Sequence, residues 1–262
     1  MGMRGSWQAL QGCAWGLALL GLCVWAGPAL AREAPAKAAV SRDMVWTVSS
    51  GNWRAIYFSS QDTRGRWTKP VQLSEGGVDS LLPCIVAGPA GKKYAVWVIR
   101  DELRLTIAYA VFDAHAWSEV RLVPDLPEEA TMPFVAVDNA GVLWLVFAGN
   151  DGATQDDIYC MRLRQGKWSR PEQVNFGNDV PDINPCIEID RKGAIQITWE
   201  GFRDGAYVLL TSRFAGDGWT EEQALSTGEL ERLQQQRQQF SEESVPNFVA
   251  DRSMLFIRSN NE

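Results

Sequence analysis

Four arginines are the residues whose type is best suited to holding a ligand: Arg54, Arg100, Arg203 and Arg258. A guanidinium group is a planar fork of N–H donors that fits a carboxylate or a sulfate, so convergent arginines would suit an anionic ligand. Acidic residues lie close to them in sequence, and surface ion pairs are the alternative interpretation. These residues are Asp101, Asp157, Glu200 and Asp204.

Three residue types recur along the chain with a period of about 50 residues. The tryptophans Trp67, Trp117, Trp168 and Trp219 are 50, 51 and 51 residues apart. A proline series and a tyrosine series share this period, with the members Pro83, Pro133 and Pro185, and Tyr57, Tyr109, Tyr159 and Tyr207. A fixed period of this length indicates a repeated supersecondary unit.

Each unit has the pattern of two β-hairpins. The first begins at the proline, carries apolar residues and breaks at an Asp-x-x-Gly turn, as in residues 133–144. The second is a short strand, a polar turn and the periodic tryptophan, as in residues 158–168. Together they make a four-stranded antiparallel sheet, and repeated sheets of this kind predict an all-β propeller with phased aromatics packed between blades.

The hairpin count favours about five blades, one of them incomplete, and four blades are the alternative. In either case ring closure requires the C-terminal hairpin to contact the N-terminal one. Residues 229–240 interrupt the repeat with good helix formers and without Gly or Pro, which predicts a short inserted helix. That helix is either a plain surface element or a lid or docking element.

One turn carries a more specific signal. Ser60, Asp62, Gly65 and Trp67 resemble the Ser-x-Asp-x-Gly-x-x-Trp box of sialidase-like β-propellers (bacterial neuraminidase or Asp-box repeats), with one extra residue before the glycine. The resemblance implies that this box lies in the turn between the third and fourth strands of a blade. There we expect Ser60 and Asp62 to bind backbone groups of the turn, and the tryptophan to pack between blades.

In propellers of this family, ligands usually bind beside the loops that join the second and third strands. Trp53 falls seven residues after Trp46, and the equivalent count in other units gives Asp101, Asp151 and Arg203. An indole at such a position could stack on a sugar ring or a peptide, or could simply lie on its own blade. The predicted ligand-binding residues are Trp53, Arg54, Arg100, Asp101, Asp151, Glu200, Arg203 and Arg258.

The sequence gives little support to catalysis. Sialidases grip a substrate carboxylate with three arginines and use a tyrosine nucleophile, but no motif matches the arginines here and no tyrosine stands apart from the structural positions. His115 is the single histidine, which excludes a multi-histidine metal site. It lies in a predicted turn far from any matched partner, which argues against a Ser-His-Asp site. No cofactor is predicted; the acidic loop 150–157 could hold calcium, or could be a solvated loop.

The net charge disfavours one class of partner, and the N-terminus predicts export. The 262-residue chain has a formal net charge of −7, which disfavours nucleic acid as a partner. Residues 1–31 have an apolar run and end in Ala29-Leu30-Ala31, which predicts a secretory signal cleaved near Ala31, with an uncleaved anchor as the alternative. Residues 32–262 then form one domain without a membrane span, either secreted or periplasmic.

An odd number of cysteines, Cys84, Cys160 and Cys186, remains after signal removal. At most one internal bridge can form, and Cys84 and Cys186 are expected to be reduced core residues.

These patterns favour a binding module for a glycan or a protein partner at the cell envelope. One alternative is a diverged exo-glycosidase of sialidase-like type that acts on an acidic sugar, and the enzyme question stays open. A second alternative is a protein-interaction scaffold that uses the inserted helix. An enzyme would need a carboxylate pair about 5 to 10 Å apart in a pocket, whereas a binding site needs only an aromatic and polar patch.

Overall fold

The computed structural model describes residues 42–102, 104–152, 155–226, 228 and 255–259, which form four antiparallel β-sheets and a short 3-10 helix, η3 (Pro89–Gly91). The first sheet contains β17 (Leu255–Ser259), β1 (Arg42–Ser50), β2 (Trp53–Gln61) and β3 (Val71–Gln72). The second contains β4 (Asp79–Ala87), β5 (Lys93–Arg100), β6 (Leu105–Phe112) and β7 (Arg121–Leu122). The predicted all-β class is confirmed.

The third and fourth sheets repeat this plan. The third contains β8 (Glu129–Val137), β9 (Leu143–Asn150) and β10 (Asp157–Arg164), and both β11 (Lys167–Trp168) and β12 (Glu172–Gln173) pair with β10. The fourth contains β13 (Asp182–Ile189), β14 (Ile195–Arg203), β15 (Ala206–Arg213) and β16 (Gln223–Ala224). No helix within the described residues has the length and hydrophobicity needed to cross a bilayer.

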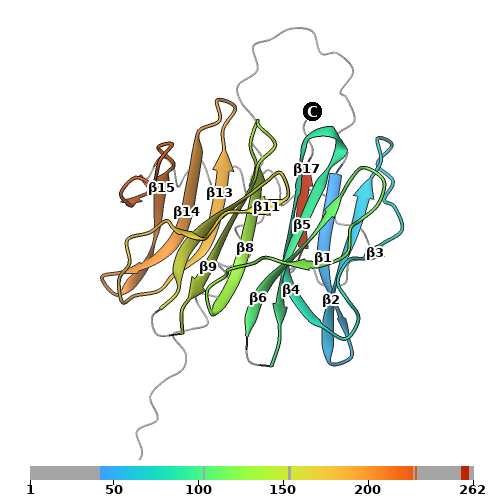
Figure 1. Ribbon diagram of the computed structural model, residues 1–262, viewed down its shortest axis with the longest axis horizontal. Coiled ribbons are helices and arrows are strands. Elements are labelled where there is room, and N and C mark those ends of the chain that lie inside the picture. The colour runs from blue at the N-terminus through green and yellow to red at the C-terminus, as the bar shows by residue number, and fades with distance from the viewer. Residues whose placement is uncertain (1–41, 103, 153–154, 227, 229–254, 260–262) are drawn as a thin grey trace, which may run out of the picture.

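The four sheets lie side by side in sequence order (Figure 1). The inner strand of each sheet packs on the preceding one: β4 on β1 and β2, β8 on β4 to β6, and β13 on β8 and β9. Between the described strands of the fourth sheet and those of the first there is no comparable packing. The sheets therefore follow one another as the blades of a propeller would, in an array that their described strands do not close.

The C-terminal strand completes the first sheet. β17 pairs antiparallel with β1, from Arg42 opposite Ser259 to Trp46 opposite Leu255, in the inner position that β4, β8 and β13 occupy elsewhere. The predicted contact between the two ends of the domain is confirmed. The described residues form four sheets, and the last strand belongs to the first of them. Residues 1–41 and 229–254, with the predicted signal and inserted helix, lie outside the described residues.

The periodic prolines occupy the inner strands, as predicted. At each of them the register with the second strand shifts, and the preceding residue has a positive φ of 51° to 55°. A bulge frees this point of the strand from ladder pairing, so proline is tolerated there despite its missing N–H. The three bulge residues are Leu82, Met132 and Asn184.

Three of the periodic tryptophans pack against the preceding sheet. The ring centroids of Trp117 and Phe58 are 5.0 Å apart, and those of Trp168 and Tyr109 are 5.4 Å apart. Trp219 packs edge-on against Trp144, at 6.4 Å. Trp67 belongs to a separate apolar cluster of the first sheet, around Met44 and Trp46. The tryptophan series thus marks the joints between sheets, which confirms its predicted role for the second to fourth units.

The tyrosine series is wrong as a structural register. A recurring hydrogen bond shows which residues of the third strands are equivalent. In each sheet, one carbonyl of the third strand accepts the N–H of the residue that follows the outer strand. The residues that supply this carbonyl are Ile56, Ile107, Ile158 and Leu209. Tyr57 and Tyr159 follow this position by one residue, Tyr109 follows it by two, and Tyr207 precedes it. Because side chains alternate between the faces of a strand, Tyr109 projects on the opposite face from Tyr57.

The box-like turn works only partly as predicted. Asp62 Oδ1 accepts the backbone N–H groups of Arg64 and Arg66, both at 2.9 Å, so it closes the turn. Ser60 instead donates its hydroxyl to Asp43 Oδ1 of β1, at 2.8 Å, and therefore links two strands. Asp113 in the second sheet plays the same part as Asp62, because its carboxylate accepts the backbone N–H groups of His115 and Ala116. The search for the box motif in the sequence did not find Asp113.

A half-buried cation joins the first two sheets. Lys93 of β5 forms an ion pair with Asp43, which is 1% exposed, and its Nζ lies 5.2 Å from the ring centre of Phe58 and 5.6 Å from that of Phe112. The lysine therefore neutralises a buried carboxylate and contacts two aromatic faces that hold cations favourably. Removing it would leave Asp43 charged and buried.

We expect Lys93→Met to lower the free energy of unfolding by about 3–5 kcal/mol, because the substitution keeps the apolar stem and removes the charge. The matched variant Arg66→Met breaks the exposed Arg66–Asp62 pair and should change stability little. Urea denaturation of both variants measures the difference. Equal, small losses in the two variants would mean that the charge of Lys93 is not needed to hold Asp43 in its buried position.

Candidate functional site

Two of the predicted arginines meet at the joint of the first and second sheets. Arg54 donates Nε and Nη2 to the two carboxylate oxygens of Asp79, at 2.8 and 2.5 Å, and its backbone N–H adds a third bond. This hydrogen bonding holds the pKa of Asp79 below its ordinary value, and the charge of nearby Arg100 acts in the same direction. Arg54 is thus committed to an internal partner and is not free to bind an anion.

Arg203 lies in a different sheet. Its Nη1 donates to Asp182 Oδ1 at 3.1 Å and its Nη2 donates to Glu222 Oε1 at 2.8 Å, so it is held within the fourth sheet. Arg258 pairs through its backbone with Asp43, at the opposite end of β1 from Trp53. Arg54 and Arg203 thus lie in separate ion pairs, and the ion-pair interpretation holds for these two residues.

Trp53 is not a loop residue. It is the first residue of β2, opposite Ser50 across a two-residue turn, and it is half-buried. The count from Trp46 misplaced it, because strand pairing makes Trp46 equivalent to Trp97, Phe147 and Trp199 instead of Trp144. Asp101 and Asp151 are exposed in loops as expected, and Glu200 is half-buried within β14.

The acidic loop after β9 uses its side chains internally. Asn150 donates its side-chain amide to Asp156 Oδ1 at 2.6 Å and accepts the N–H of Gly152 at 3.0 Å. Within the part of the chain that the structure describes, no three carboxylate, cysteine or histidine side chains are grouped as metal ligands. Cys84, Cys160 and Cys186 are all buried and none of them forms a disulfide in the described part of the chain, which agrees with the expectation of reduced core residues for Cys84 and Cys186.

A buried polar network lies between the third and fourth sheets. Asn175 donates its side-chain amide to Asp157 Oδ1 at 2.8 Å and to Asp182 Oδ2 at 2.6 Å, and accepts the N–H of Ile158 at 3.0 Å. Trp199 adds an indole N–H to Asp182 Oδ1, at 3.1 Å. One amide thus bridges a carboxylate of β10 and a carboxylate of β13.

Both bridged carboxylates are buried, Asp157 being 8% exposed and Asp182 0% exposed. Burial raises the pKa of Asp157, the hydrogen bond from Asn175 opposes this increase, and the charge of Asp182 adds to it. Burial also raises the pKa of Asp182, against the hydrogen bond and charge of Arg203. A raised pKa in a pair of carboxyl groups is typical of functional sites, and also of buried structural networks.

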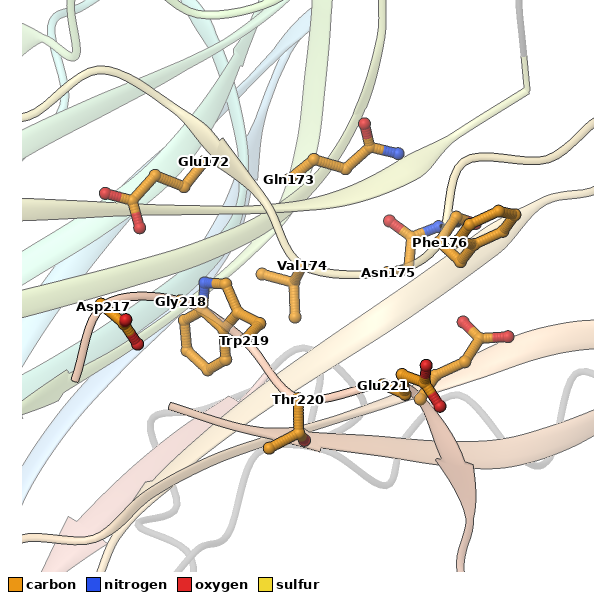
Figure 2. Close-up of a pocket in the computed structure, with 11 residues that line it drawn as sticks. Glu172, Gln173, Val174, Asn175, Phe176, Asp217, Gly218, Trp219, Thr220 and Glu221 are labelled. Atoms are coloured by element: carbon orange, nitrogen blue, oxygen red, sulfur yellow. Dashed lines mark hydrogen bonds between the residues drawn. The ribbon is translucent and has the colours of Figure 1, made fainter. Parts of the chain in front are cut away.

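A groove of about 650 Å³ lies on the outer side of this network, between the segments 172–176 and 217–222. Figure 2 shows the side chains of Val174 and Trp219 between the two segments. Glu172 and Asp217 lie towards one end of the groove, and Phe176 lies near the other end. Phe176 is 76% exposed, the most exposed large apolar side chain of those described. The groove thus combines an aromatic surface with several carboxylates.

The groove and the buried network share residues. Asn175 lines the groove and bridges the two carboxylates, and Glu222 lines the groove and accepts from Arg203. Sequence reasoning found Arg203 and noted Asp157, but missed Asn175, Asp182 and Phe176. The sequence held one signal for this network, which was Asp182 itself. The equivalent positions of the inner strands in the second and third sheets are the buried, uncharged Ser80 and Ala130, so a charged residue at this position is unusual.

No family model matches the chain, and no curated protein matches it. Among solved structures, the chain is similar to a protein of unknown function from Dyadobacter fermentans, with a TM-score of 0.53 and 12% identity, over 68% of this chain and 60% of that one. This likeness is one of fold, and the chain spans about 60% of the length of that protein.

Two carbohydrate-active enzymes also match, at lower TM-scores. An endo-arabinase from Bacteroides thetaiotaomicron has a TM-score of 0.48 and 16% identity, over 70% of this chain and 77% of that one. The NanB sialidase from Streptococcus pneumoniae has a TM-score of 0.49 and 10% identity, over 73% of this chain and 50% of that one. At these levels, neither match assigns an activity to this chain.

Gly201 is predicted to be essential for the buried network. A Cβ at this position would collide with Asp182 Oδ1 and would lie 3.0 Å from Arg203 Nη1. We expect Gly201→Ala to destabilise the protein by about 1–3 kcal/mol, because the Asp182–Arg203 pair must separate. Thermal denaturation measures this loss. Gly76→Ala is the control, since open space surrounds Gly76, and equal effects of the two variants would contradict the prediction.

Proposed function

We propose that the protein is an exported binding module that holds a neutral glycan in the groove between the third and fourth sheets. The observation that carries the proposal is the exposed ring of Phe176 beside polar side chains in a groove of about 650 Å³. That volume lies within the ~300–1,000 Å³ common for ligand sites, and an aromatic face with a few polar groups suits a sugar ring.

The charge of the groove favours a neutral sugar over an acidic one. The described lining residues include Glu172, Asp217, Glu221 and Glu222 but no lysine or arginine. Carboxylates accept hydrogen bonds from sugar hydroxyls, whereas they repel a sugar carboxylate. Two arginines that contact groove residues are occupied, because Arg162 pairs with Glu172 and Arg203 pairs with Glu222.

The glycosidase alternative has one supporting observation, the carboxyl groups of Asp157 and Asp182 with raised pKa values beside the groove. Their burial argues against it, because a catalytic carboxyl group must reach the scissile bond. The scaffold alternative depends on residues 229–240, outside the described residues. Export and cleavage near Ala31 remain part of the proposal, on the pattern of residues 1–31.

We expect affinity electrophoresis in gels containing a neutral arabinan or galactan to retard the protein, and polysialic acid to leave it unretarded. Phe176→Ala should weaken binding about three- to tenfold, because the ring supplies the stacking surface. The control is Leu122→Ala, which removes a comparably exposed apolar side chain from the outer strand of the second sheet.

Three outcomes would count against the proposal. Retardation by polysialic acid alone would favour an acidic ligand and the sialidase-like alternative. Equal binding by Phe176→Ala and Leu122→Ala would place the site elsewhere. Release of reducing sugar by the wild-type protein, lost in Asp157→Asn, would favour the glycosidase.

A further inference from the structure

The amide of Asn175 is the only described side chain that touches both buried carboxylates of the third and fourth sheets. Its two N–H groups are directed to Asp157 and Asp182, and its oxygen accepts the N–H of Ile158. All the hydrogen-bonding groups of this amide are therefore used, and its orientation is fixed by the contacts. The joint depends on two acidic groups and one neutral bridge.

Negative charge exceeds positive charge around this bridge. The carboxylates of Asp182, Asp151 and Asp156 all act on Asp157. Arg203 is the cation that faces Asp182, and it is shared with Glu222. When every carboxyl group is ionised, one guanidinium group thus serves both Asp182 and Glu222. Among the described side chains, the hydrogen-bond partner of Asp157 is the neutral amide of Asn175.

The bridge also connects to the groove. Asn175 is part of the groove wall, and Glu222 reaches the same network through Arg203. A change in the hydrogen bonding of Asp157 and Asp182 therefore acts on two residues of the groove wall. These are Asn175, which follows the outer strand of the third sheet, and Glu222, which precedes the outer strand of the fourth sheet.

We propose that the Asp157–Asn175–Asp182 bridge is a pH-responsive joint, firmest in acid, that regulates the groove on its outer side. The regulatory part rests on the proposed glycan-binding function. The pH response itself rests on the geometry of the joint and needs no ligand.

The direction of the response follows from the folded-state pKa values. Those of Asp157 and Asp182 are raised, so the stabilisation is complete below the unfolded-state pKa and is lost as pH rises through the folded-state pKa. The Arg54–Asp79 joint between the first two sheets has the opposite sign. The pKa of Asp79 is lowered, so its stabilisation is present above the unfolded-state pKa and disappears only as pH falls through the lower, folded-state value.

Hydrogen–deuterium exchange of the ligand-free protein at about pH 5 and about pH 7.5, corrected for intrinsic exchange rates, tests the joint directly. We expect peptides covering 172–182 and 199–203 to be better protected at the lower pH, by up to about tenfold for each unit of pKa difference between closed and open states. Peptides covering 54–61 and 79–87 should not gain protection. Asp157→Asn should remove most of the gain at the joint.

Equal corrected exchange at the two pH values in the 172–182 peptides would overturn the proposal, as would a full gain in Asp157→Asn. If that variant folds poorly, the comparison of the two joints within the wild-type protein still decides. A pH-dependent joint without glycan binding would remove only the regulatory part, and glycan binding with pH-independent exchange would retain the function and remove the joint.

Discussion

Face-to-face packing of neighbouring sheets is the constraint on which the rest of the structure depends. The second strands of the second and third sheets, β5 and β9, are buried along nearly their whole length, so these sheets need a neighbour on both faces. β14 differs, because Ile195, Ile197 and Trp199 are buried while the residues between them are half-buried. This alternation fits a sheet at the end of the array.

Packing between sheets also explains what the sequence could predict. The tryptophan and proline series were reliable because each position has a fixed physical task, the first at the sheet joints and the second at an inner-strand bulge. A hydroxyl follows every periodic tryptophan and accepts an N–H from the third strand, in Thr68, Ser118, Ser169 and Thr220. The tyrosine series failed because strand faces alternate and a displacement of one residue reverses the side chain.

The candidate site could be predicted only in part, for a related reason. The count from Trp46 placed Trp53 in a loop because two different tryptophan positions within a unit look alike in sequence. Arg54 and Arg203 do lie at strand ends next to the loops where the sequence placed them. Their partners, Asp79 and Asp182, come from other strands. Whether an arginine is free or paired depends on such contacts, which no local pattern contains. Phe176 had no repeat to mark it.

The resulting account places ligand binding at a joint between sheets instead of on a convergent set of arginines. A crystal structure of the protein grown with a neutral arabinan or galactan oligosaccharide tests this claim most directly. The account predicts a sugar ring against Phe176, between the segments 172–176 and 217–222. A sugar bound instead beside Arg54 and Arg100, with the groove between the third and fourth sheets unchanged, would contradict it.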